Sequence, residues 1–358
     1  MADPVAKRLD SLDALRGADM LLIIGMDGVL WALSAFLPER AGDLLRGQLS
    51  HVPWQGLSMY DLIFPLFVFI SGVAMYFSLA RASEQGRSRW KSALLLVRRA
   101  LLLVAMGWLV NKCEVPSLPM RYASVLGLIG ISCAVAGGVA LLLRRVWQRV
   151  AVAVLLLGAV GVAQALGGEP SPSGCVNAWI DQWLCPGRLY LGVLDPEGPL
   201  CVVSASALCL GGMAAGALLS AGGSRWRRAA SSAGIGLGLL LVSLCCGPCI
   251  KNIWTPAFVL ASAGVSFVLL GLFHYLFDTP SGAAWAMPLR VVGANALFIY
   301  MVTHAIPFSA MVKHLPVVQS ACGVLPEALV PVAMALCVPA LAWLLCLYLW
   351  RRRIFIRV

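Results

Sequence analysis

A histidine precedes an aspartate by ten residues at the start of a long apolar segment, in the stretch from His51 to Gly72. Imidazole is the only side chain that ordinarily changes charge near neutral pH, so it can take a proton and return it. Pro65 lacks a backbone N–H, which leaves the carbonyl of Asp61 without its helical partner. We therefore predict a proton-transferring group at this helix entrance, with Asp27 or Asp61 fixing the tautomer of His51. A loop histidine that is merely solvated is the simpler alternative.

A second carboxylate, Asp27, lies inside the first apolar segment. At ~1.5 Å per residue from Gly17 it lies ~15 Å deep, near the middle of the hydrocarbon layer. An ionisable group at that depth indicates either a functional interior or a buried ion pair. We predict that Asp27 joins His51 and Asp61 as a catalytic residue. Contact with His51 requires that the segment before residue 58 dips inward or that a vestibule reaches Asp27.

The elements that must position these side chains are membrane helices. The chain has 358 residues, 60% of them hydrophobic and 12% charged, against about 45–50% and about 25% in soluble domains. Crossing a bilayer core takes about 20 apolar residues. This composition predicts an all-α, polytopic helical bundle in one domain, residues 1–358, with a long outer loop at 168–199. The expected spans are approximately 18–37, 58–80, 93–110, 122–143, 150–167, 200–220, 230–248, 254–277, 291–308 and 327–349.

The basic residues predict the orientation. With the N-terminus inside, 20 of the 27 Lys and Arg residues fall in segments on the cytoplasmic side, as expected from the positive-inside rule. Both termini are then cytoplasmic and His51 lies on the outer side. The net charge of +11 comes from short blocks between apolar segments, so we expect no nucleic-acid partner. We also expect no cleavable signal peptide, because residues 1–17 are polar.

The cysteines and histidines carry weaker signals. A bridge between Cys175 and Cys185 would staple the long outer loop in an oxidising compartment. Cys246 and Cys249 have the spacing of a redox pair but lack a soluble βαβ context, so buried thiols or a structural bridge are favoured. The four histidines have no spacing typical of metal ligands, and we predict no metal.

Arginines on the inner side are candidates for holding an anionic ligand. Arg98 and Arg99 lie in the third apolar segment, and Arg16 lies at the entrance of the first. Such arginines either snorkel to the headgroups or bind the phosphates of a nucleotide-like ligand with their forked geometry. Arg16 can also pair with Asp19, three residues away. Asn295, inside the ninth segment, either bonds across helices or donates to a ligand.

The outer loops supply candidates for contacting a second substrate. Trp54 follows His51 closely, and Lys251, Asn252 and Trp254 lie together at the mouth of the eighth segment. A Lys with a Trp at this position is also typical of a helix anchor at the membrane interface. We predict these four residues as substrate-binding, with Asn252 and Asn295 as candidate donors to a developing oxyanion.

These stretches together resemble the membrane acetyltransferase family of heparan-α-glucosaminide N-acetyltransferase, in its bacterial branch. The motifs occur in the family's order over nearly the whole chain. They are Ser11-Leu-Asp-Ala-Leu-Arg-Gly17, His51-x-x-Trp54-x-Gly56-x-x-x-x-Asp61-Leu-Ile-Phe-Pro65-x-Phe-x-Phe-Ile-x-Gly72, Leu194-Asp-Pro-Glu-Gly198, Lys251-Asn-Ile-Trp-Thr255 and Gly293-x-Asn295-Ala-Leu-x-Ile-Tyr300.

The resemblance implies that cytosolic acetyl-CoA gives its acetyl group to an amino sugar, such as glucosamine, on the far side of the membrane. His51 matches the family's catalytic histidine, and Asp27 falls where the lysosomal members carry an Asn. The resemblance also implies a homodimer and a multi-pass protein of the bacterial inner membrane. This sequence also departs from the family's pattern at Gly127-Leu128, where many members carry Gln-Arg, so some ligand contacts are expected to differ.

The chemistry can be read onto the same residues directly. Acyl transfer from a thioester to a saccharide needs a general base and stabilisation of an oxyanion, either by direct transfer or through an acyl-histidine. We therefore predict an acyl-CoA-dependent acyltransferase with His51 as its base. The alternative is a secondary transporter of a sugar or related solute, because interrupted spans with buried Asp are also typical of transport sites. A lipid-binding scaffold would leave the polar stretch from His51 to Asp61 unexplained.

Overall fold

The apolar segments fold into helices throughout the part of the chain that the computed structural model describes, residues 9–114, 121–185, 189–306, 308–314 and 316–356. These residues contain no strand, and their only extended pairing is one isolated bridge between Gln55 and Ile250. The predicted all-α class is therefore confirmed. Of the basic residues counted for orientation, Lys7, Arg8, Arg188 and Arg357 lie outside the described residues.

The helices follow one another with short connections, except around the outer loop. They are α1 Asp10–Leu21, α2 Asp27–Leu33, α3 Glu39–Gln48, α4 Ile63–Glu84, α5 Arg89–Glu114, α6 Val125–Leu142, α7 Val146–Leu166, α8 Val176–Leu184, α9 Pro199–Ser220, α10 Arg225–Ser243, α11 Pro256–Phe277, α12 Pro280–Trp285, α13 Met287–Gly293, α14 Ala296–Ala305, α15 Phe308–Lys313, α16 Pro316–Val324 and α17 Val330–Arg351.

Eight helical stretches in the described part of the chain are long and apolar enough to cross a bilayer. The protein is therefore a polytopic membrane bundle, and the number of crossings and the side of each terminus stay predictions. The two other expected spans form α10, whose first turn carries three arginines, and the shorter pair α13 and α14. The eight stretches are Asp10–Phe36, Tyr60–Glu84, Arg89–Cys113, Val125–Leu142, Val146–Leu166, Pro199–Ser220, Pro256–Phe277 and Glu327–Arg351.

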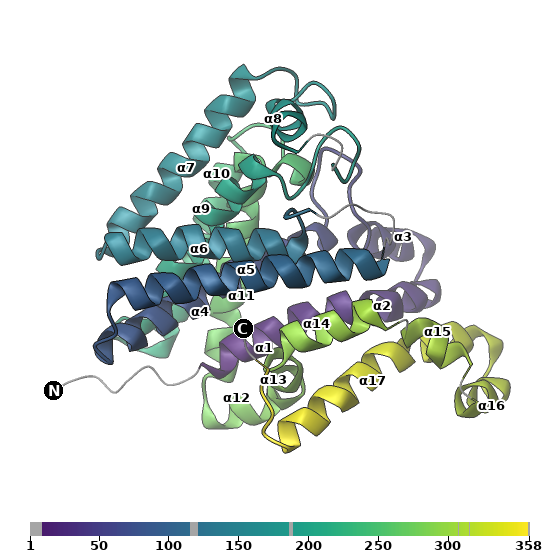
Figure 1. Cartoon of the computed structure of the whole chain (residues 1–358). Helices are drawn as coiled ribbons and strands as arrows, with labels where there is room; N and C mark the ends of the chain where they lie inside the picture. The colour runs from purple at the N-terminus through teal and green to yellow at the C-terminus, as the bar shows by residue number, and fades with distance from the viewer. Residues whose placement is uncertain (1–8, 115–120, 186–188, 307, 315, 357–358) are drawn as a thin grey trace.

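The bundle has two ends that differ in character (Figure 1). The α4–α5 and α6–α7 connections lie at the end near the N-terminus, and α3, α15 and α16 lie at the opposite end. The most extensive contacts join α10 to α11, α4 to α9, α5 to α6 and α1 to α13. Since the α4–α5 and α6–α7 connections are rich in arginine, the predicted cytoplasmic side corresponds to the end near the N-terminus.

Glycines allow the closest of these contacts. A Cβ atom on Gly72 would lie 2.1 Å from the carbonyl oxygen of Cys209, and one on Gly212 would lie 2.1 Å from that of Phe69. Gly17 and Gly293 bring α1 and α13 together in the same reciprocal way. Small residues let helix backbones approach within membranes, where apolar surface alone does not drive association. These contacts fix α1 and α4, which flank the site described below.

The first apolar segment is broken in the middle. Between α1 and α2 the chain makes a π-helical turn, Leu22–Met26, in which Gly25 has φ +125°, a value that L side chains rarely adopt. Asp27 therefore starts a second helix. Arg16 pairs with Asp13 at 3.5 Å, and both carboxyl oxygens of Asp19 are buried with no hydrogen-bond partner among the described residues. The predicted pair of Arg16 with Asp19 is therefore wrong.

The cysteines of the outer loop are not bridged. Cys175 and Cys185 are both free thiols, as are Cys246 and Cys249. Cys175 packs in a small core with Ala178, Leu194, Ile250 and Ile253. The loop is held by this apolar cluster and by the polar contacts described next. The predicted bridge between Cys175 and Cys185 is therefore wrong.

Candidate active site

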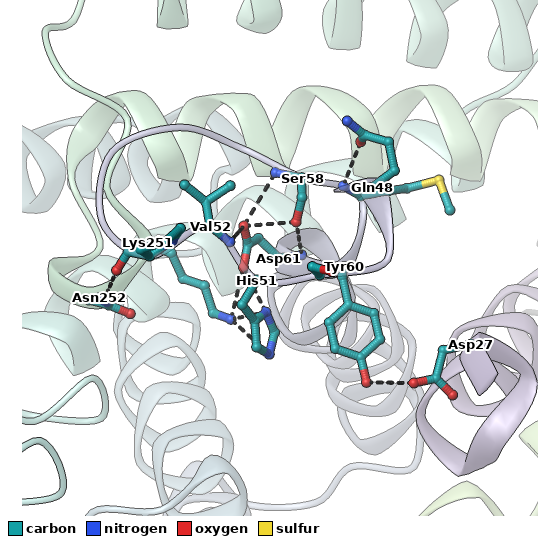
Figure 2. Close-up of polar contacts among 12 residues, drawn as sticks. Asp27, Gln48, His51, Val52, Ser58, Tyr60, Asp61, Lys251 and Asn252 are labelled. Atoms are coloured by element: carbon teal, nitrogen blue, oxygen red, sulfur yellow. Dashed lines mark hydrogen bonds and ion pairs between the residues drawn. The ribbon is translucent and has the colours of Figure 1, made fainter. Parts of the chain in front are cut away.

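His51, Asp61 and Lys251 meet at one point (Figure 2). The Nδ1 atom of His51 lies 2.8 Å from Oδ1 of Asp61, and the Lys251 ammonium lies 3.0 Å from the same oxygen. Lys251 Nζ is also 2.8 Å from His51 Nδ1 and 3.4 Å from Nε2. The His51 side chain is 56% exposed, whereas that of Asp61 is fully buried. An accessible imidazole is thus held by a buried carboxylate and a neighbouring cation.

Backbone and hydroxyl donors fix the buried carboxylate. Oδ2 of Asp61 accepts from the backbone N–H of Ser58 at 3.2 Å, from its hydroxyl at 2.9 Å and from the N–H of Val52 at 3.3 Å. Asp61 lies in a 3-10 turn, Tyr60–Leu62, that leads directly into α4. Pro65 falls in the first turn of α4, where a missing N–H costs little. The sequence thus places this carboxylate at the helix entrance in a single orientation.

A second loop brings Lys251 to this place from 190 residues away. The two loops pair where Gly56 donates its N–H to the carbonyl of Cys249 at 2.9 Å, next to the bridge at Ile250. The Lys251–Ile253 turn ends at Trp254, whose left-handed backbone (φ 48°) leads into α11. The Thr255 hydroxyl caps α11 and also accepts the N–H of Ile250. This cap holds the turn that carries Lys251.

The hydrogen bonds decide which ring nitrogen can act as a base. A protonated Nδ1 donates to Asp61, and Nε2 is then free to accept a proton. An ammonium that donates to Nδ1 would reverse this tautomer, so His51 can accept a proton at Nε2 only while Lys251 donates to Asp61. Burial lowers the pKa of Lys251, and the adjacent Asp61 carboxylate opposes that shift. Asp61 therefore favours the charged form of Lys251 against the effect of its burial.

Asp27 does not meet His51 directly. Its Oδ2 accepts a hydrogen bond from the Tyr60 hydroxyl at 3.0 Å, and the Tyr60 ring lies 4.7 Å from the His51 ring between centroids. Figure 2 shows Tyr60 pointing away from Asp61 toward Asp27. Tyr60 therefore links Asp27 to the imidazole by a hydrogen bond on one side and a ring contact on the other.

A cavity of about 520 Å³ opens beside the imidazole. Its polar lining comes from five regions that lie far apart in the chain. The apolar walls come from the π-turn region and from α4, α6 and α14. The polar lining residues are His51, Tyr60, Asn111, Arg121, Ser124, Tyr190, Glu197, Lys251, Asn252, Tyr300 and His304.

An ion-pair cluster in this wall was missed from the sequence. Arg121 contacts both oxygens of Asp195, and its NH2 group also donates to Oε2 of Glu197 at 3.0 Å. Asp181 accepts the backbone N–H of Asp195 at 2.9 Å. Burial raises the pKa of Asp181 to about 6, and burial together with the charge of Asp195 raises that of Glu197 to about 8. The motif from Leu194 to Gly198 was a signal, but its partner Arg121 lies 74 residues away.

A second cavity, of about 440 Å³, carries the arginines of the opposite end. Arg16, Arg81, Arg87 and Arg99 line it, and Arg98 lines an adjoining cavity of about 390 Å³ that shares Arg87 and Arg99. The cavities of Arg99 and His51 have four lining residues in common, and these apolar side chains form the wall between them: Phe67, Leu126, Ile129 and Leu297.

The remaining predicted residues have structural partners. Trp54 donates its indole N–H to the carbonyl of Pro170 at 2.6 Å and packs on the outer-loop core. Trp254 is 1% exposed and packs edge-on against Phe64. Asn295 is bonded to the backbone of residues 354 and 356. Asn252, which donates to the carbonyl of Pro53 at 3.3 Å, does line the cavity of His51.

The fold and the site together define a polytopic helical membrane protein with an imidazole, carboxylate and ammonium centre beside a polar cavity. Among the residues that the structure describes, no group of His, Cys, Asp and Glu could hold a metal ion.

Comparison with known proteins shows which family the first part of the chain resembles. Residues 8–170, just under half of the chain, match the family model "Heparan-alpha-glucosaminide N-acetyltransferase, catalytic". Heparan-alpha-glucosaminide N-acetyltransferase of Mus musculus is 28% identical over 135 residues, 36% of this chain and 18% of that protein. The Homo sapiens protein of the same name is 27% identical over 133 residues, 35% of this chain and 18% of its own length. The match thus spans less than a fifth of these relatives, and the resemblance predicted from the motifs is confirmed over residues 8–170.

Proposed function

We propose that this protein is a transmembrane acyltransferase that moves an acetyl group from cytosolic acetyl-CoA to an amino sugar or other saccharide on the outer side. The observation that carries the proposal is the pairing of two cavities. One holds the His51 centre, the other is lined by arginines, and four apolar side chains separate them. An acyl-CoA has this division of character, with phosphates at one end and a neutral thioester at the other.

The arginine cavity is suited to the phosphate end of the donor. Arginine forks bind phosphate oxygens in pairs, and Arg16, Arg87 and Arg99 face one volume from three different elements. The apolar wall of Phe67, Leu126, Ile129 and Leu297 would part around the thin arm that carries the thioester. The acetyl group would then enter the cavity of His51. This direction agrees with the predicted cytoplasmic side of the arginines.

The His51 centre is suited to the transfer itself. Nε2 of His51 takes the proton of the attacking amine or hydroxyl while Asp61 stabilises the imidazolium through Nδ1. The bond from the acceptor nitrogen or oxygen to the acetyl carbon forms, the carbon–sulfur bond breaks, and the thiolate takes the proton back from His51. Lys251 lies beside the ring, where its charge stabilises the oxyanion of the intermediate. Direct transfer needs no further group.

The test is acetyl transfer by the purified chain in detergent, with labelled acetyl-CoA and a panel of sugars headed by glucosamine. We expect label on a sugar with the wild type and with His314→Ala, an exposed control histidine. His51→Ala should lose transfer while still binding acetyl-CoA. Transfer by His51→Ala at the wild-type rate would remove His51 as the base. Movement of sugar across a vesicle membrane without acetyl-CoA would favour a transporter.

A further inference from the structure

The cavity of about 390 Å³ between α4 and α5 lies off the path of the proposed transfer. It adjoins the arginine cavity, with which it shares Arg87 and Arg99. It has no lining residue in common with the cavity of His51, and so it includes none of the four apolar side chains through which the thioester would pass. A donor that reaches His51 therefore has no need of this space.

The polar lining of this cavity is positive. It consists of the guanidinium groups of Arg87, Arg98 and Arg99 and the hydroxyl groups of Ser78 and Ser92, and no carboxyl group is among the lining residues that the structure describes. Within the described part of the chain, none of the three guanidinium groups has a carboxylate partner, and Nε of Arg99 is buried without a hydrogen bond. These donors are suited to an anion with several oxygen acceptors.

The wall formed by α5 faces the bilayer. Only 22% of the apolar stretch of this helix is buried inside the bundle. Leu95 and Leu102, which line the cavity, are 44% and 41% exposed. Arg98 is also exposed, ~13 Å along the helix axis from the first residue of α5, Arg89. An arginine at such a position within a span is costly unless its charge finds water or an anionic partner.

We propose that this cavity binds the phosphate group of an anionic phospholipid, such as phosphatidylglycerol, with an acyl chain lying along Leu95 and Leu102. The arginine forks would hold the phosphate oxygens in pairs. Basic pockets between membrane helices on the cytoplasmic side are typical sites for anionic headgroups, and the α4–α5 connection lies at the arginine-rich end of the bundle (Figure 1). A water-soluble phosphate compound would gain nothing from the leucines that face the bilayer. Binding of the lipid requires no acyl transfer, so the site is independent of the proposed function.

The test counts the lipids bound to the purified full chain by native mass spectrometry in a neutral detergent. Phosphatidylglycerol and phosphatidylcholine with the same acyl chains are titrated against the wild type and two variants. The wild type should hold one phosphatidylglycerol at least about tenfold more tightly than phosphatidylcholine, because the choline cation opposes the three arginines. Arg98→Gln should lose this preference. Arg227→Gln changes an exposed arginine in the first turn of α10, also on the predicted cytoplasmic side, and should bind as the wild type does.

Two further measurements guard against a folding defect. Arg98→Lys keeps the charge without the fork and should retain a reduced preference. The thermal midpoints of all variants without added lipid should agree, and phosphatidylglycerol should raise that of the wild type more than that of Arg98→Gln.

An unchanged preference in Arg98→Gln would overturn the proposal, and so would a wild type that binds both lipids equally. If Arg98→Gln weakens acetyl-CoA binding and leaves lipid binding as it is, the cavity holds a phosphate of the donor, which also overturns the proposal. Selective lipid binding that depends on Arg98 would support the site whether or not acetyl transfer is found.

Discussion

Replacement of Asp61 by Asn tests the centre most directly, because the two groups have the same shape but different hydrogen-bonding capacity. The carboxylate accepts five hydrogen bonds, from His51, Lys251, both donors of Ser58 and Val52. An amide has one accepting oxygen and one donating nitrogen. If the oxygen faces Ser58, the NH2 group donates to Nδ1 of His51, and the ring takes the tautomer that cannot accept a proton at Nε2. If the oxygen faces His51, the NH2 group opposes the donors of Ser58 and Val52.

Both orientations of the amide predict a large loss of turnover. Loss of a positioned general base lowers the rate by about 10²–10⁴-fold, and we expect kcat of Asp61→Asn to fall within that range. Lys251, which is 21% exposed, loses its counter-ion. Breaking a buried pair costs no more than about 3–5 kcal/mol, so the thermal midpoint should also fall. Kinetics at saturating acetyl-CoA and glucosamine separate the two effects, because only folded protein binds acetyl-CoA.

The control and the double variant decide how Asp61 acts. Asp43→Asn removes an exposed carboxylate that also pairs with an arginine, and it should keep full activity. His51→Ala combined with Asp61→Asn should be no slower than His51→Ala alone, because Asp61 acts through the imidazole. A kcat of Asp61→Asn within about threefold of the wild type, or losses that multiply in the double variant, would refute this reasoning.

Three further outcomes are expected. Tyr60→Phe and Asp27→Asn should each lower kcat less than about tenfold, and the double variant should lose no more than either single variant, since Tyr60 links Asp27 to the site. A hundredfold loss in Asp27→Asn with Tyr60→Phe fully active would contradict this link. In equilibrium dialysis, Arg99→Gln should bind acetyl-CoA about tenfold or more weakly than the wild type, while the exposed control Arg227→Gln should bind it normally. Equal affinities of Arg99→Gln and the wild type would indicate that Arg99 contacts lipid headgroups instead. The pKa of Glu197 is raised to about 8, so its contribution to stability is full below its ordinary pKa of 4.5 and is lost as the pH rises toward 8. Between pH 5 and pH 9 the thermal midpoint of the wild type should therefore fall relative to that of Glu197→Gln. A difference between the two midpoints that stays constant with pH would contradict the shift.

The helical membrane architecture followed from composition alone. A chain with 60% hydrophobic residues in segments of about 20 can satisfy its backbone in a bilayer only as helices or a closed barrel, and the described residues are helical. The break at Gly25 was less visible, because a glycine is also common where helices pack closely. Asp27 consequently starts a new helix whose position along the membrane normal a straight-helix count cannot give.

Contacts between nearby residues were also within reach of the sequence. His51 and Asp61 are ten residues apart, and one short turn brings them to 2.8 Å. The same reasoning failed for Arg16, because Asp13 and Asp19 are equally spaced around it on a helix. Arg16 pairs with Asp13, and the local spacing gave no reason to prefer either carboxylate.

The sequence by itself thus determined that the protein is a helical membrane protein with an imidazole and a carboxylate at one helix entrance, because these depend on composition and short range. Only the tertiary structure decided that Lys251 joins them, that Arg121 holds Glu197 in the same cavity, and that Asp27 is reached through Tyr60. Those contacts join segments that lie far apart in the chain, such as the paired loops that carry Asp61 and Lys251, and no local pattern reveals which distant segments meet.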